Sequence, residues 1–231
     1  MSVGLIVLAT APASAQLDNL LRLPRSGASA NLSDVKIGDG LKQALQVGTE
    51  KAVGLTGKPD GYFANALIKI LMPERLRMVE QGLHAVGQGA QVDEFVLSMN
   101  RAAEHAAPAA KKIFWDAIGA ISFEDARRIL QGPQTAATEY FREKTTEKLV
   151  AAFGPVVASS MNDVGATRQY KQLVGVAQSL PFGSVDAFDL DRYVIGKALN
   201  GLFVVVGQEE QRIRANPTAR VTPLLREVFG K

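Results

Sequence analysis

One stretch, Val92 to Ile121, constrains the fold more than any other part of this sequence. Apolar residues recur there every three or four positions, the spacing that places side chains on one face of an α-helix. They are Val96, Met99, Ala103, Ala106, Ala110, Phe114, Ala117 and Ile121. Because the middle of this stripe is mostly alanine, neighbouring helices can approach closely. We therefore predict a central buried helix, kinked or broken at Pro108, because a proline inside a helix removes a hydrogen bond.

The rest of the chain also favours helices. Capping residues, glycines and prolines divide it into segments with helical spacing, and no segment shows sustained alternation of apolar and polar residues. The predicted helices cover residues 33–55, 73–86, 92–121, 122–131, 135–164, 166–180, 190–215 and 222–229. We therefore predict an all-α protein, a single-domain helical bundle of about eight helices spanning residues 33–231. The apolar run near residues 67–72 is the one candidate for a short extended segment.

The N-terminal residues resemble an export signal. An apolar run, Val3 to Ala11, precedes the small-residue pattern Ala13-Ser14-Ala15, which is typical of a signal-peptide cleavage site. No basic residue precedes the run, so a short buried N-terminal element is the alternative. We predict a signal peptide over residues 1–15 ending near Ala15, a flexible leader over residues 16–32, and a periplasmic location. No later stretch is long and apolar enough to span a membrane.

Composition excludes several classes of function. The chain has 26 basic and 23 acidic residues, a balance that argues against a nucleic-acid partner. It has no cysteine, which removes disulfides, thiolate metal sites and cysteine nucleophiles. The two histidines, His84 and His105, fall on different predicted helices without metal-ligand spacing. An acidic group at Asp186, Asp189 and Asp191 is explained by helix capping. We predict no metal and no cofactor.

A cluster of polar residues on the central helix is the candidate site. Asn100 and Glu104 share one helix face, since residues four apart are neighbours, and Arg101 and His105 share the adjacent face. Other predicted helices carry residues that can reach Asn100 and Glu104. The tentative ligand-binding set is Asn100, Arg101, Glu104, Tyr140, Arg142, Arg168 and Tyr170. One interpretation is a buried network that fixes helix register, and the other is a pocket for a polar headgroup or anion.

Several segments together resemble one family. They are GLKQAL at 40–45, GTEKAV at 48–53, MNRAAE at 99–104, FEDA at 123–126, TEYFR at 138–142, TRQY at 167–170 and KALNGLF at 197–203. The combination resembles the bacterial envelope family catalogued as domain of unknown function forty-one ninety-seven, over nearly all of the chain after the leader. The resemblance implies an exported, mostly helical protein, and it brings no activity with it.

Three functional hypotheses follow. The first is a periplasmic binding protein whose alanine-lined cavity accepts an apolar or amphiphilic, lipid-like ligand. The alternative is a non-catalytic structural or interaction protein that docks an envelope protein. An enzymatic role, a hydrolase using Glu104 with His105 or another base, is placed third, since no nucleophile elbow or nucleotide-binding loop is present. An enclosed apolar cavity favours ligand binding, and a filled interior favours interaction.

Overall fold

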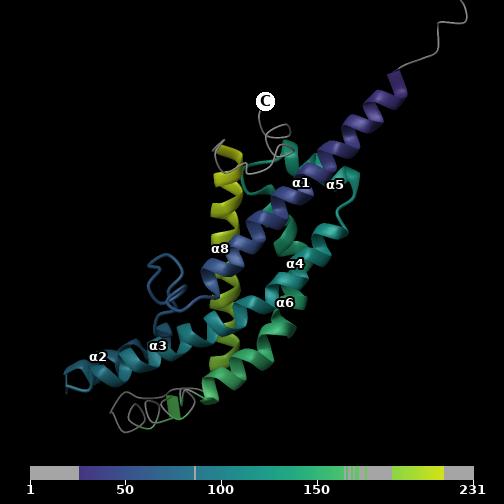
Figure 1. The fold of residues 1–231 in the computed structure, drawn as a ribbon. Coiled ribbons are helices and arrows are strands. Elements are labelled where there is room, and N and C mark those ends of the chain that lie inside the picture. The colour runs from purple at the N-terminus through teal and green to yellow at the C-terminus, as the bar shows by residue number, and fades with distance from the viewer. Residues whose placement is uncertain are drawn as a thin grey trace, which may run out of the picture.

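All the regular structure described is helical (Figure 1). The computed structural model describes residues 26–215 with gaps at 86, 164, 166, 167, 169, 172–174 and 176–188, and describes side chains from residue 37 onward. Its elements are α1 (Ser26–Thr56), η1 (Glu74–Leu76), α2 (Arg77–Ala85), α3 (Gly89–Ala106), η2 (Ala107–Ala109), α4 (Ala110–Gly119), α5 (Phe123–Gln131), α6 (Ala136–Asp163) and α8 (Leu190–Ala215). The predicted all-α class is confirmed. No helix within these ranges combines the length and apolar composition needed to cross a bilayer.

The predicted central stripe lies in the core. It runs through α3, η2 and α4, which are packed against α1, α6 and α8. Five alanines of this stretch have no exposed surface, so the neighbouring helices come close to its backbone. They are Ala102, Ala103, Ala106, Ala107 and Ala110. Phe114 is equally buried and contacts the rings of Phe141 from α6 and Phe203 from α8. This aromatic cluster joins the three helices at one end of the stripe.

The two prolines inside predicted helices have different effects. Pro108 lies in η2, a single tighter turn, and the backbone of Ala107 and Ala110 on either side stays right-handed. The helix axis therefore continues from α3 into α4 with a change of pitch at the proline. Pro155 lies inside α6, and α6 curves along its length in Figure 1. Proline removes one main-chain hydrogen bond, which allows this curvature.

Three of the predicted helix boundaries have the expected capping geometry. Ser122 Oγ accepts a hydrogen bond from Asp125 N at 3.1 Å, and Asp125 Oδ2 accepts one from Ser122 N at 3.1 Å, so α5 starts with a capping box. Asp189 Oδ1 accepts from Arg192 N at 2.9 Å at the start of α8. Gly87 and Gly165 have φ angles of 76° and 74°, the left-handed region that glycine favours where helices end.

Some predictions differ from the structure or lie outside it. Residues 66–68 form a turn and 69–73 have no regular structure, so the described residues contain no strand near 67–72. The helix α1 begins at Ser26, inside the predicted leader of residues 16–32. The signal peptide over residues 1–15, the remaining leader and the helix over 222–229 lie outside the described residues, as does most of the helix over 166–180. The count of about eight helices depends partly on those segments.

Candidate functional site

A non-helical stretch, residues 57–73, connects α1 to η1; we refer to it as the 57–73 segment. It begins with tight turns, in which Asn65 O accepts the main-chain N–H groups of Ile68 at 3.1 Å and Lys69 at 2.8 Å. Only glycine fits at position 61, because the Cβ of any other residue would lie 2.4 Å from Leu55 O and 2.6 Å from Thr56 O. A connection of this length without regular structure is uncommon in a compact domain and is usually functional.

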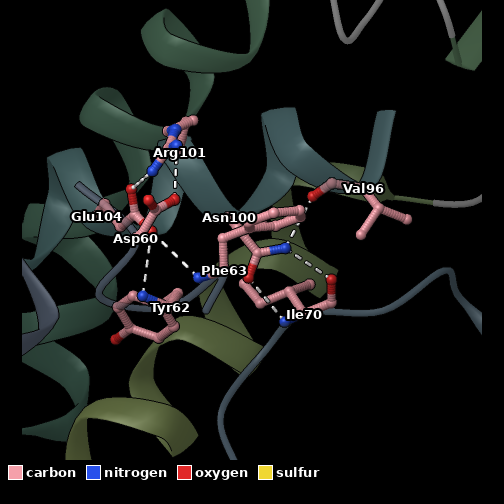
Figure 2. A network of polar contacts seen from close by, with 8 residues as sticks. All are labelled: Asp60, Tyr62, Phe63, Ile70, Val96, Asn100, Arg101 and Glu104. Atoms are coloured by element: carbon pink, nitrogen blue, oxygen red, sulfur yellow. Dashed lines mark hydrogen bonds and ion pairs between the residues drawn. The ribbon is translucent and has the colours of Figure 1, made fainter. Parts of the chain in front are cut away.

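Glu104 of α3 holds the first half of this segment (Figure 2). Its Oε1 accepts hydrogen bonds from the main-chain N–H groups of Tyr62 at 3.0 Å and Phe63 at 3.2 Å. Its Oε2 accepts from Arg101 Nη1 at 2.6 Å. Glu104 is only 2% exposed, and a buried carboxylate needs such donors, since leaving it unpaired would cost several kcal/mol. Both carboxylate oxygens are therefore used within the protein.

Arg101 extends the network to the surface. Its Nη2 donates to Asp60 Oδ1 at 2.7 Å, so one guanidinium joins two carboxylates. The hydrogen bond that Arg101 donates to Glu104 is the main reason that the pKa of Arg101 lies above its usual value. Asp60 has φ of 64°, a left-handed backbone conformation that aspartate tolerates better than most residues. The ion pair fixes the side chain of Asp60 at this turn.

Asn100, one helical turn before Glu104, holds the second half of the segment. Its Oδ1 accepts from Ile70 N at 2.9 Å, and its Nδ2 donates to Ile70 O at 2.8 Å (Figure 2). The second Nδ2 hydrogen bond goes to Val96 O at 2.7 Å. The amide thus pairs with both main-chain groups of Ile70, as a neighbouring strand residue would. Because Asn100 is fully buried, a substitution that removes the amide leaves these groups unpaired.

Tyr62 connects the segment to α8. Its side chain is fully buried, and its hydroxyl donates to Ala198 O at 2.7 Å. Burial, with a smaller contribution from Glu104, raises the pKa of this hydroxyl far above its usual value, so Tyr62 stays neutral. The ring lies against Gly201, where an added Cβ would be 2.7 Å from Tyr62 Cε1. Gly201 therefore permits a close approach, between α8 and the 57–73 segment.

The other four tentative site residues have different partners. Tyr170 stacks on Phe95, with ring centroids 6.3 Å apart. Arg142 lies over the Phe203 ring at 4.6 Å and donates to Asn200 Oδ1 at 3.3 Å. Arg168 is exposed. Among the described residues, the hydrogen bonds of Asn100 and Glu104 go to main-chain groups of the 57–73 segment, to Arg101 and to Val96 O, and none goes to these side chains. The buried network at Asn100 and Glu104 joins α3 to the 57–73 segment, and a role in fixing the register between helices stays a prediction.

Tyr140 and Arg142 do share a surface feature. They line an open hollow of about 520 Å³ between α5 and α6, together with Asp125, Arg128 and Ile129. Burial is the main cause that raises the pKa of the Tyr140 hydroxyl, and the negative charge of Asp125 adds to it. The hollow has an apolar floor and charges of both signs around it. It can accommodate a small amphiphile or a side chain of another protein.

A second carboxylate network was not anticipated from the sequence. Glu210 of α8 is buried and accepts hydrogen bonds from the main-chain N–H groups of Ala137 and Thr138, each at 2.9 Å, at the start of α6. Arg214 Nη2 donates to Glu210 Oε1 at 3.0 Å and to Ile129 O at 2.7 Å. The carboxylate satisfies N–H groups that a helix start leaves unpaired. The sequence offered one indication of this network: Glu210 and Arg214 are four residues apart, a spacing that allows an ion pair on one helix face.

One pair of side chains among the described residues has the spacing of a nucleophile and its base. His105 Nδ1 lies 3.1 Å from Ser160 Oγ, which is the distance between a nucleophile and its base. However, Glu104 points to the 57–73 segment, so it does not orient His105. Within the described ranges, no group of three or more acidic or histidine side chains is arranged to hold a metal ion. Among the residues that the structure describes, no acidic side chain is seen to bond His105 as the third member of a catalytic triad would.

The fold and site define a class: an all-α protein in which a central helix uses buried polar side chains to fasten a long connection. The chain belongs to the family described as Protein of unknown function (DUF4197), whose model matches residues 31–230. The resemblance found in the sequence is therefore confirmed. Searches of curated proteins and of solved structures returned no match.

Proposed function

We propose that this chain is a non-catalytic interaction protein of the bacterial envelope, which docks a partner protein through the 57–73 segment and the start of α2. The supporting observation is where apolar side chains are exposed. Among the described residues, the three most exposed large apolar side chains are Leu67 at 73%, Met78 at 65% and Leu71 at 62%. The other large apolar side chains that are exposed lie on four different helices and have exposed fractions of 41–47%; they are Trp115, Phe123, Val150 and Val204. The three most exposed all lie between residues 67 and 78 of the chain, and exposed apolar side chains that gather in one region are typical of a docking surface.

The buried network supports the same proposal. Leu67 and Leu71 flank Ile70, whose main-chain groups are both bonded to Asn100. Tyr193 of α8 donates to Leu71 O at 3.0 Å. The 57–73 segment is already ordered by these hydrogen bonds, so it loses little conformational entropy when a partner binds. A smaller entropy cost gives tighter binding.

The packing of the core argues against a lipid-sized ligand inside the bundle. The two small holes described at the α1–α8 junction have volumes of about 10 and 20 Å³, enough for one water molecule at most. Pockets for drug-sized ligands measure roughly 300–1,000 Å³. The small size of these two holes favours interaction over ligand storage at this junction of the described residues. Export to the envelope is part of the same proposal.

Site-specific photo-crosslinking in the native host tests this proposal. A photoreactive residue at Leu67 or at Leu71 should capture the same partner protein, and one at Val150, an exposed apolar position on α6, should not. With that partner purified, the double variant Leu67→Ser, Leu71→Ser should weaken binding about tenfold or more, equivalent to roughly 1.4 kcal/mol. Its melting temperature should stay close to wild type, since both side chains are exposed. Unchanged affinity in this variant would refute the proposal.

A second candidate function is amphiphile binding at the hollow between α5 and α6. It is favoured because Tyr140 and Arg142, both in the tentative ligand-binding set, line that hollow. Native mass spectrometry of protein purified from its host should then show a bound small molecule that Tyr140→Ala removes. If wild type carries no such molecule in repeated preparations, this function is rejected and the first is unaffected.

A further inference from the structure

Arg142 of α6 carries a half-buried positive charge without a carboxylate beside it. Three arginines are half-buried in the part of the chain that the structure describes, and the other two, Arg101 and Arg214, each form an ion pair with a buried glutamate, at 2.6 Å and 3.0 Å. Arg142 instead lies over the Phe203 ring at 4.6 Å and donates to the uncharged side chain of Asn200 at 3.3 Å. A guanidinium has five N–H donors, so most of its donors remain available to a ligand.

Tyr140, two residues before Arg142, carries a second polar group without a partner. The residue is only 9% exposed, yet its hydroxyl makes no hydrogen bond to any residue that the structure describes. A buried tyrosine hydroxyl usually has a hydrogen-bond partner, as the hydroxyl of Tyr62 does in donating to Ala198 O at 2.7 Å. The Tyr140 hydroxyl is therefore a donor that a bound molecule can satisfy.

The hollow between α5 and α6, which both of these side chains line, also carries other charges. Asp125 already accepts hydrogen bonds from the start of α5 and forms an ion pair with Arg128. Glu143 is paired with the adjacent lysine at 2.8 Å. Glu139 is exposed, so solvent screens its charge. Arg142, which is half-buried, is therefore the charged group of the hollow that most requires an opposite charge.

We propose that this hollow binds an anionic amphiphile, whose carboxylate or phosphate head accepts hydrogen bonds from Arg142 and from the Tyr140 hydroxyl. A guanidinium suits such a head, because its N–H groups can bind two oxygens of a carboxylate or phosphate at once. The apolar part of the ligand lies against Ile129, Pro133 and Ala136, which also line the hollow. This inference rests on the second candidate function, amphiphile binding, and adds the charge of the ligand and the residues that recognise it.

Two-dimensional NMR titration of the full chain with four probes tests this inference. Octanoate, octyl phosphate, uncharged octanol and octylammonium share one alkyl chain and differ in the head. At least one of the two anions should bind about tenfold more tightly than octanol, since a hydrogen bond to a charged group contributes about that much. The amide signals of Ile129 and Tyr140 should shift, because these residues line the hollow.

Matched variants assign the effect to the two side chains. Arg142→Gln should remove the preference for the anion, whereas Arg192→Gln, which removes a positive charge from an exposed position on α8, should leave it unchanged. Tyr140→Phe retains the ring and should weaken anion binding about threefold to tenfold. The NMR spectrum of each variant reports whether it is folded. If Arg142→Gln does not fold, Arg142→Lys, which cannot bind two oxygens in the same way, should still lower the preference.

The results that overturn this inference differ from those that reject amphiphile binding itself. If octanol shifts the signals of the hollow and binds as tightly as both anions, amphiphile binding stands and the anionic head is wrong. Tighter binding of octylammonium than of the anions also overturns the inference. An equal loss of anion binding in Arg142→Gln and Arg192→Gln would mean that net charge alone attracts the anion. If no probe shifts the signals of the hollow, this inference and the second candidate function are both rejected.

Discussion

Replacing Glu104 with alanine tests the central structural claim, that a buried carboxylate fastens the 57–73 segment to α3. The substitution removes the acceptor of the main-chain N–H groups of Tyr62 and Phe63 and the partner of Arg101. Water has poor access to the site, since Glu104 is 2% exposed. The unpaired groups therefore have no ready replacement in the folded state.

The expected loss can be estimated from these contacts. A buried N–H group without an acceptor costs about 1–3 kcal/mol, and Tyr62 N qualifies fully, whereas Phe63 N is only partly buried. Arg101 contributes less, because its side chain is 29% exposed and keeps Asp60 as a partner. Together these effects lower the free energy of unfolding by roughly 3–5 kcal/mol. For a chain of this size, that corresponds to a fall in melting temperature of about 10 °C.

Urea unfolding followed by far-ultraviolet circular dichroism, combined with limited trypsin digestion, measures this loss. The matched control is Glu50→Ala, since Glu50 forms an exposed helix-surface ion pair with Lys111 at 2.5 Å; exposed pairs are worth at most about 1 kcal/mol. Glu104→Ala should also make Lys58 and Lys69 in the 57–73 segment more sensitive to trypsin. Glu104→Gln, which retains one oxygen acceptor, should fall between the two.

The outcome that refutes the reasoning is equally specific. If Glu104→Ala and Glu50→Ala unfold at the same urea concentration with the same slope, the buried network does not stabilise the fold. If stability falls but trypsin cleaves the segment no faster, then Glu104 contributes to the core without holding the segment.

Three other substitutions probe separate features. Gly201→Ala would place a methyl group 2.7 Å from the Tyr62 ring, so thermal melting should show a loss of about 1–3 kcal/mol; an unchanged melting temperature would mean that the ring moves freely. Ser122→Ala removes the α5 cap and should cost about 1 kcal/mol at pH 7. Part of this loss comes from the hydrogen bond that the Ser122 hydroxyl donates to the Asp125 carboxylate, which holds the pKa of Asp125 below its usual value. That part is present at neutral pH and is lost as the pH falls below about 4, whereas the bond from Asp125 N to Ser122 Oγ does not depend on pH. Urea midpoints should therefore show a smaller effect of the substitution at pH 3 than at pH 7, and an equal difference contradicts this. Glu210→Ala should lower the free energy of unfolding by about 3 kcal/mol, because it leaves the buried N–H groups of Ala137 and Thr138 at the start of α6 without an acceptor. Urea unfolding followed by circular dichroism measures this, and a loss below about 1 kcal/mol counts against it.

The sequence predicted the side chains of the candidate site on α3 but not the groups that they bind. Asn100, Arg101 and Glu104 were found because polar residues interrupt an apolar stripe, which demands partners. Their partners were expected among the side chains of other helices, such as Arg168 and Tyr170. The partners are main-chain groups of Tyr62, Phe63 and Ile70. A main-chain N–H group is present at every residue except proline, so its participation leaves no mark in the sequence.

The sequence alone determined the helical class, the central position of α3 and α4, and helix ends such as the capping box at Ser122. These features depend on interactions between residues a few positions apart, and the residue types report them directly. Tertiary structure alone decided that Glu104 and Asn100 hold a connection, that Glu210 caps α6, and that Leu67 and Leu71 face outward. Each of these joins residues that are distant in the chain or uses groups common to all residues. Such contacts depend on how the helices pack, which local sequence patterns do not encode.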